Sequence, residues 1–529
     1  MKRYIITILI ILAGHIAFGQ DFFDALRYSQ TNYGGTARSV SMGSAFGSLG
    51  GDFISASINP AGMGLYRSGE FTLSPTLNIN GADASYLGTN SSDNKYRFNF
   101  DNISYVGVIN TGSASGIMSV SFGFGVNRLK NFNNNISIVG NNAETTLLSY
   151  YTDMANKIGD PTKFYKLEEG LAYDTWLIDY DNNEEVLEGK YFNDLSNYSS
   201  YVINDENGNF KGYGYKEVGV KSHNQRKSVR TSGRIDEYVM SLGLNVNHKL
   251  FFGGSISLLD LEYYQSSTFT ESDDYQNSNY FKDYSMYSSL NHSGAGVNFK
   301  AGLIYRPFKM LRVGLAVHTP NFYTINCSES NTIDANFDQP VGDNTNNYSN
   351  NWNYTSTADD YQFELETPFK TIASASLLFG KLGIVSVDYE WQNYANAKFR
   401  DSGDNWDYSS KNTVMANMYQ STSNLRIGAE LRATDNFFLR AGYQHLGNPW
   451  VDNYEETAVA NRNDSFNTYS AGFGYRQQSF FIDFAYRLSD ISTAYKVHEM
   501  VPNDPMNGKN IAQLNYTNSQ ATITLGFRF

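Results

Sequence analysis

The sequence has only one cysteine, Cys327, among its 529 residues. A single cysteine cannot form an internal disulfide framework or a multi-thiolate metal site, so neither is expected to stabilise this chain. Long hydrophobic runs are also missing: after the N-terminal leader, no stretch reaches the ~18 apolar residues of a membrane-spanning helix. Basic residues are in deficit as well. The 40 Lys and Arg residues face 53 Asp and Glu, and the net charge of −13 argues against a nucleic-acid partner.

Sequence signatures of catalysis are absent too. The chain contains no Gly-x-Ser-x-Gly elbow, no His-Glu-x-x-His motif and no phosphate-binding loop. Its seven histidines are scattered without paired spacing, and its 40 tyrosines permit haem ligation without indicating it. We therefore expect a protein that is not an enzyme and that needs no metal or cofactor.

The N-terminal residues have the pattern of an export signal. A basic pair at 2–3 precedes an apolar run at 5–13 and small residues around 17–19. The apolar run is too short for a flanked membrane anchor, which is the alternative interpretation. We predict that residues 1–19 are a signal peptide and that the mature chain begins at Gln20.

Aromatic residues are abundant, at 15% of the chain, yet the mean hydropathy is only −0.43. A soluble protein with so many rings would read as more hydrophobic, whereas a membrane β-barrel spreads its apolar residues over one face of each strand. Alternation with a period of two recurs along the chain, at 71–79, 117–127, 238–246, 297–305 and 425–431. Alternation alone also fits a soluble sandwich whose apolar faces point inward.

The connections between these strands favour the barrel. Tight turns at 247–249, 306–310 and 432–436 alternate with long polar segments, as in outer-membrane barrels. The long segments are 265–293, 321–366, 395–423, 446–465 and 490–518. Cys327 falls in one of them, so we expect it to be an outer-loop thiol. The last residues alternate and end on Phe529, which resembles the C-terminal strand that barrel-insertion machinery recognises.

One region has helical rather than strand periodicity. Apolar residues of 143–158 fall on one helical face, and Asp160-Pro161 has the pattern of an N-cap and a first-turn proline that begin a second helix. The two helices lie in the longest interruption of the strand pattern, 132–234. We expect them on the extracellular side.

A coil of Gly, Ala and Ser precedes the first long strand and contains Asn59-Pro60-Ala61-Gly62. Glycine permits left-handed backbone and close approach, and proline cannot join a β-ladder, so the coil suits a chain threaded inside a barrel. A flexible periplasmic tail is the alternative. The segment Gly34–Gly64 resembles the N-terminal hatch of FadL-type long-chain fatty acid transporters. Later segments resemble the same family in order, at 305–323, 367–380, 387–399, 426–445 and 471–488.

The resemblance implies an all-β fold, a transmembrane antiparallel β-barrel of about 14 strands. In this reading residues 20–69 form the hatch or plug, 70–529 the barrel, and about 140–180 a helical extracellular insertion. The long aromatic loops are most similar to those of Bacteroidetes members, some of which carry a hemin-receptor label. The implied location is the outer membrane of such a Gram-negative bacterium, with outer-membrane lipid and the insertion machinery as partners of a monomer.

The resemblance also implies a function: passive uptake of hydrophobic small molecules, above all long-chain fatty acids, by plug rearrangement and lateral release into the bilayer. Three alternatives stay open. The barrel could take up haem, it could be a non-transport interaction barrel such as an adhesin or secretion accessory, or it could be an open solute porin.

Candidate site residues follow from the amphipathic nature of a fatty acid, which needs an apolar slot with a polar end. The plug residues Asn59, Pro60, Ala61 and Gly62 would form the hatch gate. In the third strand, Gly123 and Gly125 would mark the lateral opening, or would only make room for plug side chains. The uptake-slot candidates, which could equally just pack the two helices together, are Leu147, Leu148, Tyr151, Met154, Phe164, Leu171 and Trp176.

Inward-facing cations are a further set of candidates. Any of them could meet a ligand carboxylate, or could pair with an inward acid such as Glu430. They are Lys300, Arg312, Arg426 and Arg440.

Overall fold

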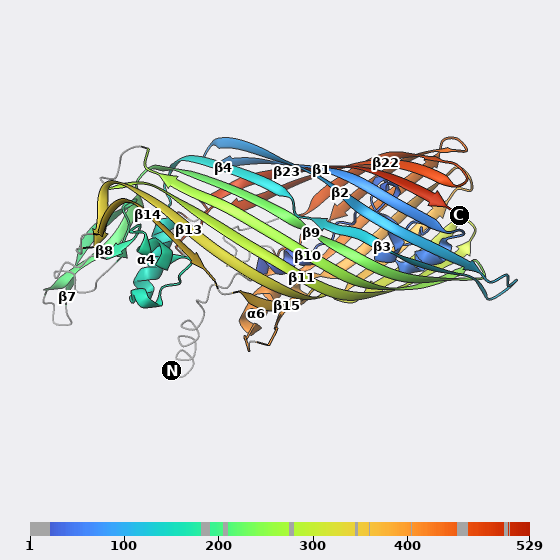
Figure 1. Cartoon of the computed structure of the whole chain (residues 1–529), viewed down its shortest axis with the longest axis horizontal. Coiled ribbons are helices and arrows are strands. Elements are labelled where there is room, and N and C mark those ends of the chain that lie inside the picture. The colour runs from blue at the N-terminus through green and yellow to red at the C-terminus, as the bar shows by residue number, and fades with distance from the viewer. Residues whose placement is uncertain are drawn as a thin grey trace.

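A computed structural model of the chain describes residues 22–180, 191–204, 210–274, 280–343, 347–358, 360–403, 405–451, 464–501, 506 and 508–529. The predicted signal peptide lies outside the described residues. The main sheet closes on itself as a 14-stranded antiparallel barrel, which Figure 1 shows lengthwise. The predicted fold class is therefore confirmed. Closure occurs where the last strand returns to the first and Phe71 pairs with Phe527.

The ring strands, in order around the barrel, are β1 (Glu70–Tyr86), β2 (Thr89–Asn110), β3 (Ile117–Asn131), β9 (His223–Val246), β10 (Leu250–Ser272), β11 (Phe281–Phe308), β12 (Leu311–His318), β16 (Lys370–Leu378), β17 (Gly383–Asn393), β19 (Ser421–Arg432), β20 (Phe437–Leu446), β21 (Phe466–Arg476), β22 (Phe480–Lys496) and β23 (Ile511–Arg528). The tight turns expected at 247–249, 306–310 and 432–436 join neighbouring ring strands at one end.

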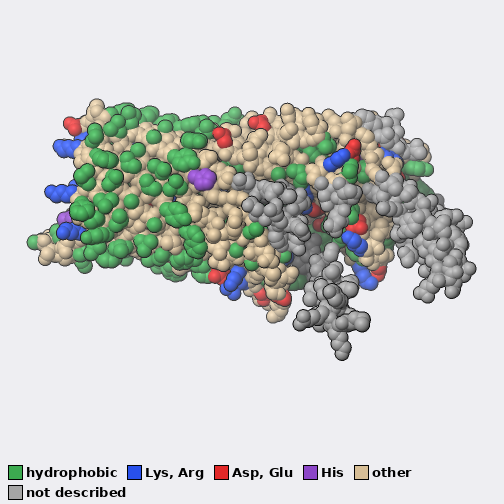
Figure 2. Space-filling view, turned by 180° about the vertical axis from the view of Figure 1, so that it is seen from behind, with side chains coloured by type: hydrophobic (Ala, Val, Ile, Leu, Met, Phe, Trp, Pro, Cys, Tyr) green, Lys and Arg blue, Asp and Glu red, His purple; other side chains and the backbone are tan. Residues whose placement is uncertain are grey.

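Each ring strand has an outer and a lumen face because successive side chains alternate. On β9, Tyr238 and Met240 face outward and are 48% and 70% exposed. Ser241, the next residue on the strand, faces the lumen and is buried. Figure 2 shows such apolar side chains gathered over one half of the visible face, while the other half is mainly polar. An apolar outer band around a polar interior is the arrangement of a transmembrane barrel, not of a soluble sandwich.

Beyond the apolar band, part of the wall continues upward as a tall open sheet, here called the extension. Its strands pair with the upper parts of β9 and β11 and with one another. They are β4 (Asn134–Ala143), β13 (Phe322–Asp343), β14 (Asn347–Thr357), β15 (Tyr361–Glu366) and β18 (Lys398–Asp401). The segments 265–293 and 321–366 were expected to be loops, and that expectation is wrong over most of their length. Outside the membrane neither face of a strand has to be apolar, so the sequences of these strands lack alternation and have the polar composition of loops.

Helices of the insertion lie at the extension end of the molecule (Figure 1). They are α4 (Leu147–Ile158), η2 (Pro161–Lys163) and α5 (Glu169–Asp174). Asp160 caps η2 just before its proline, as expected, but the turn is 3₁₀ and the second α-helix begins only at Glu169. Two hairpins follow, β5 (Asp179–Tyr180) with β6 (Tyr191–Phe192) and β7 (Ser196–Asn204) with β8 (Phe210–Val220). Short η3 (Tyr394–Asn396) and α6 (Ser409–Met418) lie elsewhere on the rim. None of the described helices is long and apolar enough to cross a membrane.

The N-terminal segment fills the barrel at the other end (Figure 1). Its helices are α1 (Phe22–Ser29), α2 (Ala37–Ser41), α3 (Ser55–Ile58) and η1 (Pro60–Leu65), and we call residues 22–69 the plug. Gly253 pairs with Gly243 on one side and with Gly302 on the other, which forms a row of glycines across the wall. A side chain on Gly253 or Gly302 would collide with Pro60 or Asn59. Plug backbone therefore rests directly on wall backbone.

Candidate functional site

A cavity of about 760 Å³ lies in the lumen between the plug and the insertion. Plug residues Phe22 and Phe23 line one side of it, and Leu147 and Tyr151 of α4 line another. Two smaller cavities, of 210 Å³ and 290 Å³, share lining residues such as Asn518 with it. We refer to the three together as the lumen chamber. Its lining mixes aromatic rings with amides and charged groups, so it suits an amphipathic molecule better than a purely apolar one.

The predicted uptake-slot residues divide between this chamber and the interior of the insertion. Leu147 and Tyr151 reach the chamber, and the Tyr151 hydroxyl donates to Met286 Sδ at 3.3 Å. The other five do not line it: Leu148, Met154, Phe164, Leu171 and Trp176. Leu148 and Leu171 are fully buried among insertion and extension residues. Helical periodicity identified the buried face of α4 but could not tell a face toward a cavity from one toward a neighbouring helix.

The wall is interrupted where β3 gives way to β4. β2 pairs with β3 only from Asn102–Asn127 to Asn110–Ser119. The β3 ladder with β9 is irregular between Arg128 and Lys130, and after Asn133 the chain continues as β4, which pairs with β9 and not with β2. Residues 89–101 of β2 therefore have a strand partner only in β1. We call this gap in the ladder the wall break.

The chamber reaches the wall break from inside. Asn80 and residues 131–134 line the 290 Å³ cavity, and Asp101, Arg128 and Lys130 line the 210 Å³ cavity. The Asn131 side chain accepts from Asn133 N at 2.9 Å, a local bond that turns the chain out of the β3 ladder. The chamber therefore lies directly behind the wall break, and side-chain hydrogen bonds from Asn80 to the Asn133 carbonyl and from Ser91 to the Ser137 carbonyl cross the gap in the ladder.

Aromatic side chains flank the wall break on the outside. Tyr96, Phe98 and Phe100 of β2 are 67%, 61% and 46% exposed. The rings of Phe98 and Phe100 meet edge to face at 5.6 Å. Because these rings extend the apolar outer band to the unpaired edge of β2, a molecule leaving through the break would meet a hydrophobic surface.

Gly123 and Gly125 lie below the break, in the continuous part of the ladder. A side chain on Gly123 would collide with Met63, and one on Gly125 with Phe53, both from the plug. These contacts fit the alternative that the two glycines make room for the plug, and the gap in the ladder lies at 128–133, beyond them. The signal for it in the sequence is the Asn-rich stretch 131–135, which ends the alternation of β3.

Most of the predicted inward cations are paired with acids. Lys300 contacts Glu237, and Arg426 donates to Glu390 at 2.7 Å. Arg312 donates to the Leu49 carbonyl at 2.6 Å.

Two cations that the sequence analysis missed have a different environment in the chamber wall. Lys130 Nζ donates to the Arg27 carbonyl at 2.9 Å, and Arg487 Nη1 donates to Asn32 Oδ1 at 3.0 Å. Among the described residues, the hydrogen-bond partners of both cations are neutral oxygens.

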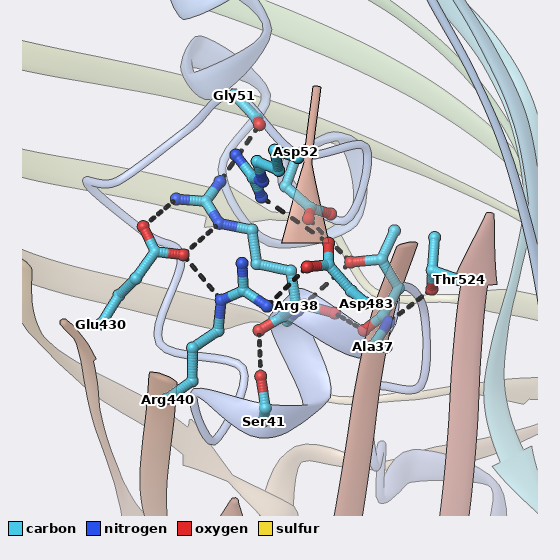
Figure 3. Close-up of polar contacts among 12 residues, drawn as sticks. Ala37, Arg38, Ser41, Gly51, Asp52, Glu430, Arg440, Asp483 and Thr524 are labelled. Atoms are coloured by element: carbon cyan, nitrogen blue, oxygen red, sulfur yellow. Dashed lines mark hydrogen bonds and ion pairs between the residues drawn. The ribbon is translucent and has the colours of Figure 1, made fainter. Parts of the chain in front are cut away.

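A buried ion network fastens the plug to the wall (Figure 3). Arg38 of α2 donates twice to Glu430 of β19, at 3.0 Å and 3.1 Å. Arg440 of β20 donates to the same carboxylate and to Asp483 of β22, each at 2.7 Å. One plug arginine is therefore tied to three wall strands through shared carboxylates, an arrangement in which breaking one member leaves buried charge.

The predicted gate residues form a second attachment of the plug. All four of them are buried. Asn59 Nδ2 donates to the Gly47 carbonyl at 2.6 Å, and its Oδ1 accepts from Ala61 N at 3.1 Å. The side chain thus caps the turn that Pro60 begins and holds that turn against the glycine row of the wall.

Glu168, just before α5, lines the chamber from the insertion. Burial and the nearby carboxylates of Glu169, Glu499 and Glu329 raise the pKa of Glu168 to about 7. This carboxyl therefore changes charge near neutral pH, on the side of the chamber opposite the plug.

Cys327 is not in an outer loop as expected. It lies on β13, is buried, and its Sγ is 3.1 Å from His292 Nε2. The other ring nitrogen of His292 is 2.6 Å from the hydroxyl of Tyr28 in the plug.

Sequence comparisons find no family model and no curated protein that match the chain. Solved structures do match. A FadL homologue from Pseudomonas aeruginosa has a TM-score of 0.50 at 12% identity, covering 94% of this chain and 99% of that one. The Pseudomonas putida toluene transporter TodX has a TM-score of 0.49 at 12% identity, covering 95% and 100%. The Ralstonia pickettii toluene transporter TbuX has a TM-score of 0.46 at 16% identity, covering 94% and 98%.

Proposed function

Since the chain has the fold of the FadL-type barrels, we propose that it is an outer-membrane channel of a Gram-negative bacterium for hydrophobic or amphipathic small molecules. The ligand enters the lumen chamber from the insertion side and leaves sideways through the wall break into the bilayer. The finer proposal is that long-chain fatty acids are the cargo. The observation that carries the transport proposal is the continuity between the chamber and the break at Asn80 and residues 131–134.

The plug supports lateral release over passage along the barrel axis. Plug residues from 33 to 64 are almost all buried, and the Arg38–Glu430 network and the Asn59 turn hold them to the wall. Moving the plug would break several buried hydrogen bonds at once, each costing about 1–3 kcal/mol when left unmade. The route through the break leaves these plug contacts in place and breaks only local side-chain hydrogen bonds such as that from Asn80 to the Asn133 carbonyl.

The chamber's chemistry supports an acidic head group on the cargo. Lys130 and Arg487 line the 210 Å³ cavity. Each side chain has more N–H groups than the neutral oxygens that accept from it among the described residues. A carboxylate there would gain charge-assisted hydrogen bonds, worth about 1.5–3 kcal/mol each. Toluene and other neutral hydrocarbons cannot form a charge-assisted hydrogen bond with either cation.

The test is ligand retention measured by native mass spectrometry on the delipidated full chain, with laurate, toluene and haem offered together. We expect laurate to be retained. Its affinity should fall about tenfold in Lys130→Gln and in Arg487→Gln, because each loses one charge-assisted bond. Lys157→Gln, an exposed lysine of α4 paired with Asp153, is the matched control and should leave retention unchanged.

Other outcomes separate the alternatives. Retention of toluene without laurate would keep the channel and remove the fatty acid. Retention of haem alone would favour haem uptake, and retention of none of the three would favour an interaction barrel.

The Glu168 carboxyl predicts a pH dependence of binding. Its pKa of about 7 leaves it mostly neutral at pH 6 and mostly ionised at pH 8, where it repels an anionic ligand. Decanesulfonate, which stays ionised throughout, should therefore bind severalfold more tightly at pH 6 than at pH 8. The Glu168→Gln variant should lose this difference in isothermal titration calorimetry. An unchanged pH profile in that variant would assign the dependence to another group.

A further inference from the structure

A second hollow lies on the outer face of the wall, away from the lumen chamber. It has a volume of about 540 Å³, and its lining residues come from β11, β13, β15 and the end of β18. They are Asn291, Ser293, Asn326, Cys327, Ser328, Asp360, Tyr361, Gln362 and Ser402. We call this feature the outer hollow.

The strand pairing explains why the wall is hollowed at this point. β13 pairs with β15 up to Cys327–Tyr361, and it pairs with β14 only from Ser330–Thr357 upward. The partner of β13 changes across Ser328, so the outer surface is indented there. Asn291 and Ser293 form the opposite side, because β11 pairs with β13 through this region in regular register.

The outer hollow faces the surroundings of the barrel at the upper margin of the apolar band. Asn326 is on the same face of β13 as Phe322, which is 46% exposed, and Ser293 is on the same face of β11 as Phe299, which is 48% exposed. Asn326 lies four positions along the strand from Phe322, which corresponds to about 10 Å along the barrel axis for a tilted strand. That height is the head-group level of a membrane whose hydrocarbon ends near Phe322.

The lining is rich in neutral hydrogen-bonding groups. Amides and hydroxyls dominate it, Asp360 is its single acid, and no Lys or Arg is among the described lining residues. Gln362 Nε2 donates to Asn326 Oδ1 at 2.8 Å, and Ser402 Oγ donates to the Gln362 carbonyl at 2.6 Å, which fixes the orientation of the rim. Paired donors and acceptors without a cation suit the hydroxyl groups of a sugar better than a phosphate.

We propose that the outer hollow binds the sugar head of a glycolipid in the outer leaflet. The acyl chains of that lipid lie on the apolar band below, against Phe299 and Phe322, and the sugar hydroxyls contact Asn291, Ser293 and Asn326. Continuity with the band argues for a membrane glycolipid over a free saccharide. The inference rests on the proposed membrane location of the barrel and is independent of its transport function.

The test is native mass spectrometry of the full chain with three probes: a monogalactosyl diacylglycerol, a phosphatidylethanolamine with the same acyl chains, and free galactose. We expect the galactolipid to be retained at least tenfold better than the phospholipid. The Ser293→Trp/Asn326→Trp variant fills the outer hollow and should reduce galactolipid retention to the phospholipid level. Both positions face outward, so barrel folding should be unaffected, which circular dichroism checks.

The matched control is Gln513→Trp, an exposed position on the outer face of β23 across the barrel, which should bind as the wild type does. Equal retention of the two lipids, or undiminished galactolipid binding by the filled variant, would overturn the proposal. Free galactose bound as well as the galactolipid would replace the membrane lipid by a soluble sugar. Laurate retention by the filled variant should be normal, so this result is separate from the test of the lumen chamber.

Discussion

Replacing Glu430 with glutamine is expected to loosen the plug and open the barrel to small hydrophilic solutes. Glu430 accepts from Arg38 of the plug and from Arg440 of the wall, and all three side chains are buried. The substitution leaves the two buried arginines with Asp483 and Asp52 as the remaining labelled acids of the cluster in Figure 3. Removing one partner of a buried ion pair costs about 3–5 kcal/mol.

That cost should fall on the plug and not on the barrel. The wall strands are held by continuous ladders on both sides of β19 and β20, whereas α2 is a short helix held by side-chain contacts. Withdrawal of Arg38 into solvent relieves the repulsion at the smallest structural cost. In planar bilayers, Glu430→Gln should conduct ions readily, while the wild-type chain should remain nearly closed.

Two further variants make this result specific. Arg432 ends the same strand as Glu430, and Arg432→Gln removes its surface ion pair with Asp435 of the following turn, worth about 0–1 kcal/mol, so this variant should stay closed. The double variant Arg38→Met/Glu430→Gln removes the unpaired charge of the plug, so its ion conductance should be lower than that of Glu430→Gln. This difference measures the energetic coupling between Arg38 and Glu430. A closed and fully stable Glu430→Gln barrel would show that the network does not retain the plug.

The sequence was most informative where the membrane imposes a rule. Lipid outside and a polar lumen inside force alternation on strands such as β9, and the tight turn at 247–249 could be read from the break between two alternating runs. The extension was missed because its strands stand in water, where neither face must be apolar. In β14, for example, Tyr348, Trp352 and Tyr354 share one face, but Asn350 interrupts that row and the segment is otherwise polar.

The candidate site was harder to predict because it depends on partners far apart in the chain. Arg38 and Glu430 are separated by 392 residues, and no spacing rule connects them. The wall break is a gap in the ladder between β2 and β3, and the Asn-rich stretch 131–135 marks where β3 ends without indicating which neighbouring strand loses its partner. Gly123 and Gly125 were sensible candidates for a bend, but glycine also serves close packing, and Met63 and Phe53 occupy the space they leave.

Substituting tryptophan for Asn80 is expected to slow release of the ligand more than it weakens ligand binding. Asn80 lines the chamber at the wall break, and its amide donates to the Asn133 carbonyl. An indole at this position would fill the passage between β1 and the β3–β4 turn. Lys130 and Arg487 remain in place, but Asn80 also lines the 210 Å³ cavity beside them, so laurate affinity should fall by up to about tenfold, which corresponds to about 1.4 kcal/mol.

Transfer should be measured in proteoliposomes by stopped-flow quenching, with a pyrene-labelled fatty acid delivered from albumin and a quencher in the bilayer. With the fatty acid at a saturating concentration, the transfer rate for Asn80→Trp should fall at least tenfold. Ser85→Trp is the control, because Ser85 lies on the same strand but faces outward above the break. Equal transfer by Asn80→Trp and the wild type would place the exit elsewhere.

Combining the two substitutions distinguishes lateral release through the wall break from passage along the barrel axis. The Glu430→Gln/Asn80→Trp variant has a loosened plug and a blocked wall break. If release is lateral, ion conductance stays high in this variant while transfer of the fatty acid to the bilayer stays low, because an opened axial path leads to water and not to lipid. Restored transfer would instead show that the cargo passes the plug, and the wall break would then be a structural feature of the extension.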